Sequence, residues 1–158
     1  MTAKKFALIA SKGSLDWAYP PFILASTAAA LDYEVSIFFT FYGITLLKKD
    51  ISDLKISPLG NPSMPMPMPV PMPNFVQMLP GIESIATMMM KQKISAKGIA
   101  SIEELRFACL ESGVKFIACQ MTVDLFDFKP TDFIDGIELG GAATFLEFAG
   151  KSDVNLFI

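Results

Sequence analysis

The chain has 158 residues, a length that fits one domain and needs no disulfide or metal ion to fold. Charged residues make up only 18 % and hydrophobic residues 52 %, whereas the usual charged share is about 25 %. This deficit indicates that part of the surface is covered, and a homo-oligomer is the simplest cover. The net charge is −3 and the 13 basic residues are scattered, which argues against a nucleic-acid-binding protein.

The sequence contains no histidine. A Cys–His or Ser–His–Asp nucleophile is therefore excluded within the chain, and so is a zinc site with histidine ligands. Two cysteines alone do not complete a structural zinc site, and we expect neither a metal nor an organic cofactor. The first apolar run, residues 6–10, is too short for the core of a signal peptide. Two reduced cysteines and no export signal predict a cytoplasmic protein.

The first half of the chain predicts two buried strands, each followed by a helix. Residues 6–10 and 35–41 are continuous apolar runs, as in strands that are covered on both faces. A loop over 11–19 follows the first strand and leads to a helix over 22–31, with Pro20 and Pro21 fixing its first turn. A short helix over 43–49 follows the second strand.

Residues 58–80 form a Met/Pro-rich segment within the predicted domain. Proline at every second position of 65–73 forbids a helix and removes the donors that a strand needs. Residues 56–82 carry no charge, but a membrane span must satisfy its backbone as a helix, so we expect no transmembrane segment. We expect an extended loop. It packs on its own subunit, or it serves an oligomer contact, a partner or a membrane surface.

The second half predicts further alternation of helices and strands. Ile82, Ile85 and Met89 form one stripe of a helix over 81–97. A capping box, Ser101 with Glu104, opens a helix that ends at Gly113. The remaining predicted elements are a strand at 114–118, a helix at 123–128 capped by Thr122, a turn at 130–133, a strand at 137–139, a helix at 142–149 and a strand at 154–158.

This alternation predicts one α/β domain over 1–158, a doubly wound and mostly parallel sheet of about five strands with helices on both faces. In such sheets, sites form beyond the carboxyl ends of the strands. Three loops qualify, 11–19, 42–43 and 119–122, and only the third contains a nucleophile. Cys119 lies between a strand end and a helix start, where amide groups and the helix dipole favour a thiolate. The alternative is that Cys119 is a small core residue.

Cys109 follows Ile102 and Leu105 on the buried stripe of its helix, which favours a core position. The helix runs antiparallel to the next strand, so the two cysteines are offset by more than about 10 Å along the sheet. A disulfide needs Cα atoms within about 7 Å, and we expect none between them.

The loop over 11–14 has only a weak likeness to a phosphate loop, because neither GxGxxG nor GxxxxGK[ST] is present. Such a loop is more often a simple glycine turn than a phosphate-binding site. Aromatic residues near the strand ends are candidates for pocket walls, although packing is the more frequent use of aromatics there. Asp124 and Asp127 lie near the cysteine and are expected to face water. The candidate pocket residues are Gly13, Ser14, Trp17, Tyr19, Tyr42 and Gly43.

Residues 113–121 resemble the cysteine region of the DsrE/DsrF-like family, and more narrowly of its larger, peroxiredoxin-like branch in sulfur-metabolising prokaryotes. Residues 9–16, 38–43 and the Met/Pro-rich segment are similar to that branch as well, as is the helix that contains Cys109. The resemblance implies a DsrEF-like fold with flavodoxin-like layering, homo-oligomer assembly and sulfur carried on Cys119. It also implies partners of three kinds: a TusA-like sulfur carrier, a rhodanese and a heterodisulfide-reductase-like complex.

The favoured hypothesis is therefore a sulfur carrier or sulfurtransferase that holds a persulfide or thiosulfonate on Cys119. Cys109, Gln120, Met121 and Thr122 are auxiliary candidates, with amides over 120–123 holding the thiolate. The first alternative is a non-catalytic module that binds a nucleotide or another small anion at the same sheet edge. The second is an oligomeric adaptor that works through the Met/Pro-rich segment.

Overall fold

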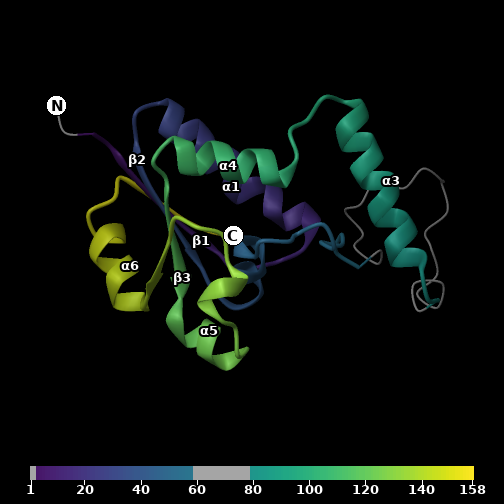
Figure 1. The fold of residues 1–158 in the computed structure, drawn as a ribbon. Coiled ribbons are helices and arrows are strands. Elements are labelled where there is room, and N and C mark those ends of the chain that lie inside the picture. Colours follow the sequence, from purple (N-terminus) through teal and green to yellow (C-terminus); the bar gives the residue numbers. More distant parts are fainter. Residues whose placement is uncertain (1–2, 59–78) are drawn as a thin grey trace.

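The sheet has five parallel strands in the order β4-β3-β2-β1-β5. The computed structural model describes residues 3–58 and 79–158, so most of the expected Met/Pro-rich loop at 58–80 lies outside the described residues (Figure 1). The predicted α/β class, the strand number and the parallel pairing are confirmed. The strands are β1 (Lys5–Ala10), β2 (Glu34–Phe39), β3 (Lys115–Cys119), β4 (Ile137–Gly140) and β5 (Val154–Phe157).

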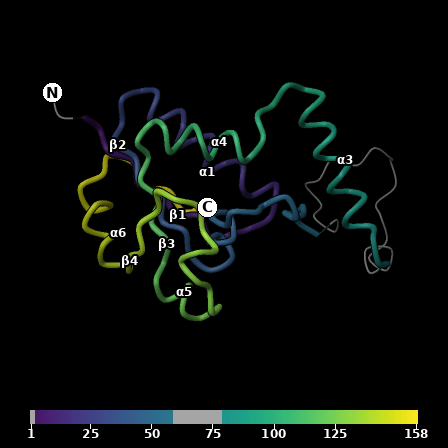
Figure 2. Tube along the Cα trace, in the orientation of Figure 1, coloured from purple at the N-terminus to yellow at the C-terminus, as the bar shows by residue number. Residues whose placement is uncertain are grey.

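Helices cover both faces of the sheet unequally. Two helices, α1 (Leu15–Ala30) and α4 (Ile102–Glu111), lie side by side on one face, and α6 (Ala142–Ala149) covers the other (Figures 1 and 2). The carboxyl ends of β2 and β3 lead into the 3₁₀ helix η1 (Phe41–Leu47) and into α5 (Gln120–Leu125). The remaining helices are α3 (Ile82–Ala96), at one end of the molecule, and the 3₁₀ turn η2 (Pro130–Asp132).

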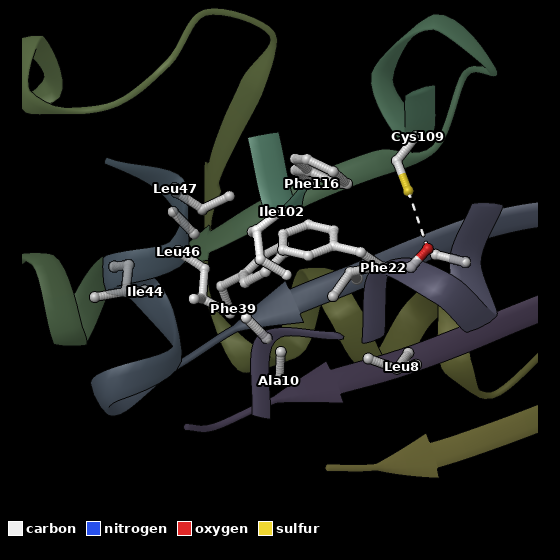
Figure 3. Close-up of a cluster of buried hydrophobic side chains, with 14 of the residues drawn as sticks. Leu8, Ala10, Phe22, Phe39, Ile44, Leu46, Leu47, Ile102, Cys109 and Phe116 are labelled. Atoms are coloured by element: carbon white, nitrogen blue, oxygen red, sulfur yellow. Dashed lines mark hydrogen bonds between the residues drawn. The ribbon is translucent and has the colours of Figure 1, made fainter. Parts of the chain in front are cut away.

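The main core lies between the sheet and the α1–α4 layer (Figure 3). Phe22 of α1 packs against Phe39 and Phe116, with ring centroids 5.9 and 5.8 Å apart. Because successive residues of a strand face opposite sides, Phe116 and Ala118 belong to this core. Ile117 and Cys119 belong instead to a smaller cluster beneath α6. The alternation of β3 thus places Cys119 on the face that a single helix covers.

Helix α1 begins at Leu15, seven residues before the predicted start, so the prediction of a loop over 11–19 was wrong for its second half. Pro20 and Pro21 lie inside the helix and remove two intrahelical donors. Contacts with a distant segment hold the first turn: the Leu15 amide donates to the Lys55 carbonyl at 2.7 Å, and Asp16 accepts from the Ser57 amide at 2.8 Å. Local sequence does not reveal this tertiary support.

The capping box of α4 is present as predicted. The Ser101 hydroxyl accepts from the Glu104 amide at 3.2 Å, and the Glu104 carboxylate accepts from the Ser101 amide at 2.7 Å. Gly113 follows the helix with φ +79°, a left-handed conformation that glycine adopts without steric cost. These signals fix both ends of the helix that leads into β3.

Replacing Ser101 by alanine is expected to lower the free energy of unfolding by about 1 kcal/mol, because the Glu104 amide loses its acceptor. Urea unfolding followed by circular dichroism measures the change. Ser84→Ala, at an exposed position of α3, is the matched control and should leave stability nearly unchanged. Equal effects of the two substitutions would contradict the cap assignment.

Two apolar segments are exposed although their sequences suggest burial. Helix α3 exists as predicted, but it presents Thr87 to the 52–56 segment, and Ile85 and Met89 of the predicted stripe are exposed. Strand β5 lies at the sheet edge, where every residue is exposed, Phe157 at 72 %.

Candidate functional site

Cys119 ends β3 and is the N-cap residue of α5. Its place at a strand end before a helix is as predicted, but α5 begins at Gln120, so Thr122 is not the cap that the sequence suggested. Thr122 lies in the first turn of the helix and is fully buried. In the register of the sheet, Phe39 pairs with Ala118, so Thr40, the next residue after β2, comes beside Cys119.

Hydroxyl groups from both strand ends meet at this position. The Thr122 Oγ1 accepts the Phe41 amide at 3.1 Å and lies 3.4 Å from the Thr40 Oγ1. Phe41 has φ +47°, a left-handed conformation that costs about 1–3 kcal/mol for a residue with a side chain. This strained residue directs its amide to the threonine that adjoins the cysteine, so the start of η1 and the cysteine loop are one hydrogen-bonded unit.

The pKa of Cys119 is lowered although the residue is only 4 % exposed. Burial raises the pKa of the thiol and is the largest single influence. The hydroxyl and amide of Thr122, the hydroxyl of Thr40 and the amide of Met121 together outweigh it, because hydrogen bonds to the thiolate stabilise the charged form. These groups therefore favour the thiolate form of Cys119 without a histidine.

Cys109 differs from Cys119 in its surroundings and in the direction in which its pKa is shifted. It is completely buried in the main core, where its Sγ lies 3.5 Å from the Phe22 carbonyl oxygen (Figure 3). Burial raises its pKa to about 12, so it is a neutral thiol at physiological pH. The predicted core position is confirmed. Both cysteines are free, as predicted. They lie on opposite faces of the sheet, whereas the sequence suggested only an offset along the sheet.

The predicted pocket residues do not form one pocket around Cys119. Gly13, Ser14, Trp17 and Tyr42 line a hollow of about 750 Å³ beyond β1 and β2, and Cys119 is not among its lining residues. Tyr19 lines a different hollow, of about 680 Å³, between α1 and the start of α4. Trp17 and Tyr19 separate because both lie on helix α1, where two residues span about 200°.

Gly13 and Gly43 allow the loops that follow β1 and β2 to pack closely against each other. A Cβ atom at Gly13 would overlap the Tyr42 carbonyl, and one at Gly43 would overlap the Ala10 carbonyl. Gly43 is buried and therefore contributes no pocket wall, contrary to the prediction. These two glycines let η1 lie directly against the end of β1, which brings Thr40 and Phe41 to the cysteine loop.

The other auxiliary candidates lie at the surface of α5. Gln120 is exposed and donates to the Asp124 carboxylate at 2.8 Å, and the Met121 side chain is 66 % exposed. Asp124 and Asp127 both face water, as predicted. Gln120 thus points away from the thiol, and Met121 contributes its amide to Cys119 while its side chain faces outward.

Sequence reasoning missed Thr40, Phe41 and Arg106. Arg106 of α4 is buried and donates from one nitrogen to the carbonyls of Leu46 and Lys48, at 2.9 and 2.7 Å, which fixes the end of η1. Thr40 could have been predicted from the parallel pairing of the strands. It directly follows the strand next to the cysteine strand, at the same edge of the sheet. The contact of Arg106 had no signal in the local sequence.

In the part of the chain that the structure describes, no three or more Cys, Asp or Glu side chains are grouped so that they could bind a metal ion. Within the same residues, no helix combines the length and hydropathy that crossing a membrane requires.

Three comparisons place the chain among known proteins. The DsrE/DsrF/DrsH-like family model matches residues 2–157. Sulfur carrier protein DsrE2 of Allochromatium vinosum is 63 % identical over the full length of both chains, and YrkE of Bacillus subtilis is 31 % identical over 98 % of this chain and 97 % of its own. The crystal structure of the ychN protein from E. coli superposes with a TM-score of 0.54 at 10 % identity, covering 98 % and 99 % of the two chains. The chain therefore belongs to the DsrE/DsrF/DrsH-like family.

Proposed function

We propose that this chain is a sulfur carrier that holds sulfane sulfur on Cys119. The observation that carries the proposal is the position of Cys119 at the end of β3 beside Thr40 and Thr122, whose hydroxyls help to lower the pKa of a covered thiol in a chain without histidine. The full-length relative named sulfur carrier protein DsrE2 supports the same function. A thiolate that accepts a sulfur atom, stores it and passes it on needs no general base and no cofactor.

The loading step conserves sulfur, electrons and protons. The Cys119 thiolate attacks the outer sulfur of a donor persulfide, the donor's S–S bond breaks, and the donor leaves as a thiolate. A new S–S bond joins the Cys119 Sγ to the transferred sulfur, so no oxidant or reductant is consumed. Delivery is the same step in reverse towards an acceptor thiolate. The hydroxyls of Thr40 and Thr122 and the amides of Met121 and Thr122 stabilise the negative charge before attack and after delivery.

The cover over Cys119 suits the storage of sulfur. A persulfide exposed to water and to free thiols loses its outer sulfur, whereas Cys119 is only 4 % exposed beside Phe38, Ile117 and Phe145. The cargo is a persulfide or a thiosulfonate, and the donors and acceptors that the resemblance implies are TusA-like, rhodanese-like and heterodisulfide-reductase-like proteins. Exposed Leu146, Leu156 and Phe157 support the further proposal that the carrier is a homo-oligomer.

Intact-mass measurement after incubation with polysulfide, and separately with a thiosulfonate donor, tests the function. We expect an adduct of one or more sulfur atoms, or of a thiosulfonate group, that a reductant removes and that peptide mapping places on Cys119. The mass of the adduct identifies the cargo. No adduct under either condition, or an adduct on Cys109 only, would contradict the proposal and favour a small-anion binding module.

A further inference from the structure

Phe41 starts η1 with a left-handed backbone that its residue type does not favour, at φ +47°. Among the described residues, the other left-handed residues besides glycine are Asp32 and Asp127, and aspartate tolerates this conformation because its short side chain bonds locally. The Phe41 ring is 47 % exposed and is not a core side chain. A costly conformation beside the cysteine loop indicates that the backbone of this residue has a role there.

Contacts on both sides of Phe41 hold it in this conformation. The Thr40 amide donates to the Ala10 carbonyl at 3.1 Å, and the Thr40 carbonyl accepts from the Gly43 amide at 3.0 Å. Arg106 holds the far end of η1 through two backbone carbonyls. Both ends of η1 are thus fixed, and the left-handed residue at its start persists despite its cost.

The Thr122 hydroxyl has a single proton, and neighbouring groups compete for it. The Phe41 amide donates to the Thr122 Oγ1 at 3.1 Å, which occupies a lone pair and leaves the proton free to be donated. The Thr40 Oγ1, 3.4 Å away, and the Cys119 sulfur are the neighbouring acceptors. Without the amide, a threonine hydroxyl in a helix can turn instead to a carbonyl of the preceding turn. The amide also polarises the hydroxyl and so strengthens the bond that the hydroxyl donates.

Charged side chains do not supply this effect. The groups that lower the pKa of Cys119 are hydroxyls and backbone amides. The charged side chains on the elements around Cys119, and at the ends of these elements, are not among them: Lys48, Lys115, Asp124, Asp127, Glu138 and Glu147. A change at Phe41 therefore reaches the sulfur through hydrogen bonds.

We propose that Phe41 is a positioning residue whose left-handed backbone directs its amide to Thr122 and thereby turns the Thr122 proton towards the Cys119 sulfur. The inference rests on the proposed function, because the thiolate that this arrangement favours is the one that accepts sulfur. Phe41 acts through Thr122, and its ring is not required. The strain at Phe41 is the energetic cost of the arrangement.

Replacing Phe41 by phenyllactate, its α-hydroxy-acid analogue, tests the amide directly, because the ester keeps the ring and deletes the N–H. The ultraviolet absorbance of the thiolate is followed against pH, with the Cys119→Ser protein subtracted. Cys109 does not interfere, because burial raises its pKa to about 12. We expect the Cys119 midpoint to move to higher pH. Alkylation by iodoacetamide at neutral pH should slow about threefold or more, because part of the Thr122 contribution is lost.

Phenyllactate at Phe107 is the matched control. This residue lies in α4 and is 64 % exposed, so the same chemical change removes a hydrogen bond within a helix of the opposite layer. It should lower the stability of the protein and leave the titration of Cys119 unchanged.

Two substitutions separate the backbone conformation from the ring. Both remove the ring, but asparagine tolerates the left-handed region and the β-branched valine resists it. The midpoint of Phe41→Val should therefore lie at higher pH than that of Phe41→Asn, and its sulfur loading from polysulfide at neutral pH should be slower. Asp32→Val, at an exposed left-handed residue after α1, should lose stability without moving the titration.

The contrary outcomes are distinct. An unchanged midpoint in the phenyllactate protein would overturn the proposal, whether or not Phe41→Val folds. Equal midpoints in Phe41→Val and Phe41→Asn would also overturn it, because the left-handed backbone would then have no influence on the sulfur. A wild-type protein that titrates as expected but accepts no sulfur from polysulfide would instead refute the proposed function and leave the positioning role intact.

Discussion

Cys119→Ser is expected to lose sulfur loading completely, from polysulfide and from any persulfide donor. A serine hydroxyl remains protonated at neutral pH, so neither Thr40 nor Thr122 has an anion to stabilise, and no nucleophile faces the donor. Stability should change little, because serine preserves the size of the side chain and the same hydrogen-bonding groups surround it. Intact mass after incubation with polysulfide, read with and without reductant, gives the result directly.

Cys109→Ala is the matched control for this experiment. Cys109 is a neutral thiol that the main core encloses, so its removal should leave loading intact. It should lower the free energy of unfolding by about 1 kcal/mol, because a small cavity replaces the sulfur. A Cys109→Ala protein that no longer loads, while its circular dichroism is unchanged, would show that sulfur transfer depends on both cysteines.

Thr122→Val is expected to raise the pKa of Cys119, because the thiolate loses a hydroxyl donor and hydrogen bonds to charged groups contribute about 1.5–3 kcal/mol. The folded protein lowers this pKa, so the rate of alkylation rises with pH through a midpoint below that of an ordinary cysteine. The variant's midpoint should move to higher pH. At a fixed neutral pH, alkylation and sulfur loading should slow about tenfold or more.

The pH profile of iodoacetamide alkylation, measured in the Cys109→Ala background, tests this expectation. Thr122→Ser retains the hydroxyl and is the matched control, so its profile should lie near that of the parent protein. Thr122→Val also leaves the Phe41 amide without its acceptor, which should cost about 1–3 kcal/mol of stability. A profile that does not move in Thr122→Val would refute the assignment of the hydroxyl as a thiolate donor.

The linkage between protonation and folding has a definite sign at Cys119. Its pKa is lower in the folded than in the unfolded chain, so the stability contributed by this group is fully present above the unfolded pKa. It is lost as the pH falls through the folded pKa. Cys109 has the opposite sign, because its pKa is raised: its contribution is present below the unfolded pKa and is lost as the pH rises through about 12.

The sequence by itself determined the class of fold and the residue that carries the proposed chemistry. Buried strands are continuous apolar runs, so β1, β2 and β3 were recognisable without neighbours. The capping box and Gly113 set the ends of α4, since they act over one helical turn. Cys119 was identifiable because it is the nucleophile at the end of a buried strand.

Only the tertiary structure decided which groups surround Cys119. Thr40 and Thr122 are 82 residues apart and meet because β2 and β3 are neighbours in register, which no local pattern encodes. Helix α1 begins at Leu15 because the 55–57 segment accepts and donates at its first turn, and this moves Trp17 and Tyr19 onto opposite sides of a helix. Short-range signals thus specify where elements form, whereas hydrogen bonds between distant segments specify which side chains surround the thiol.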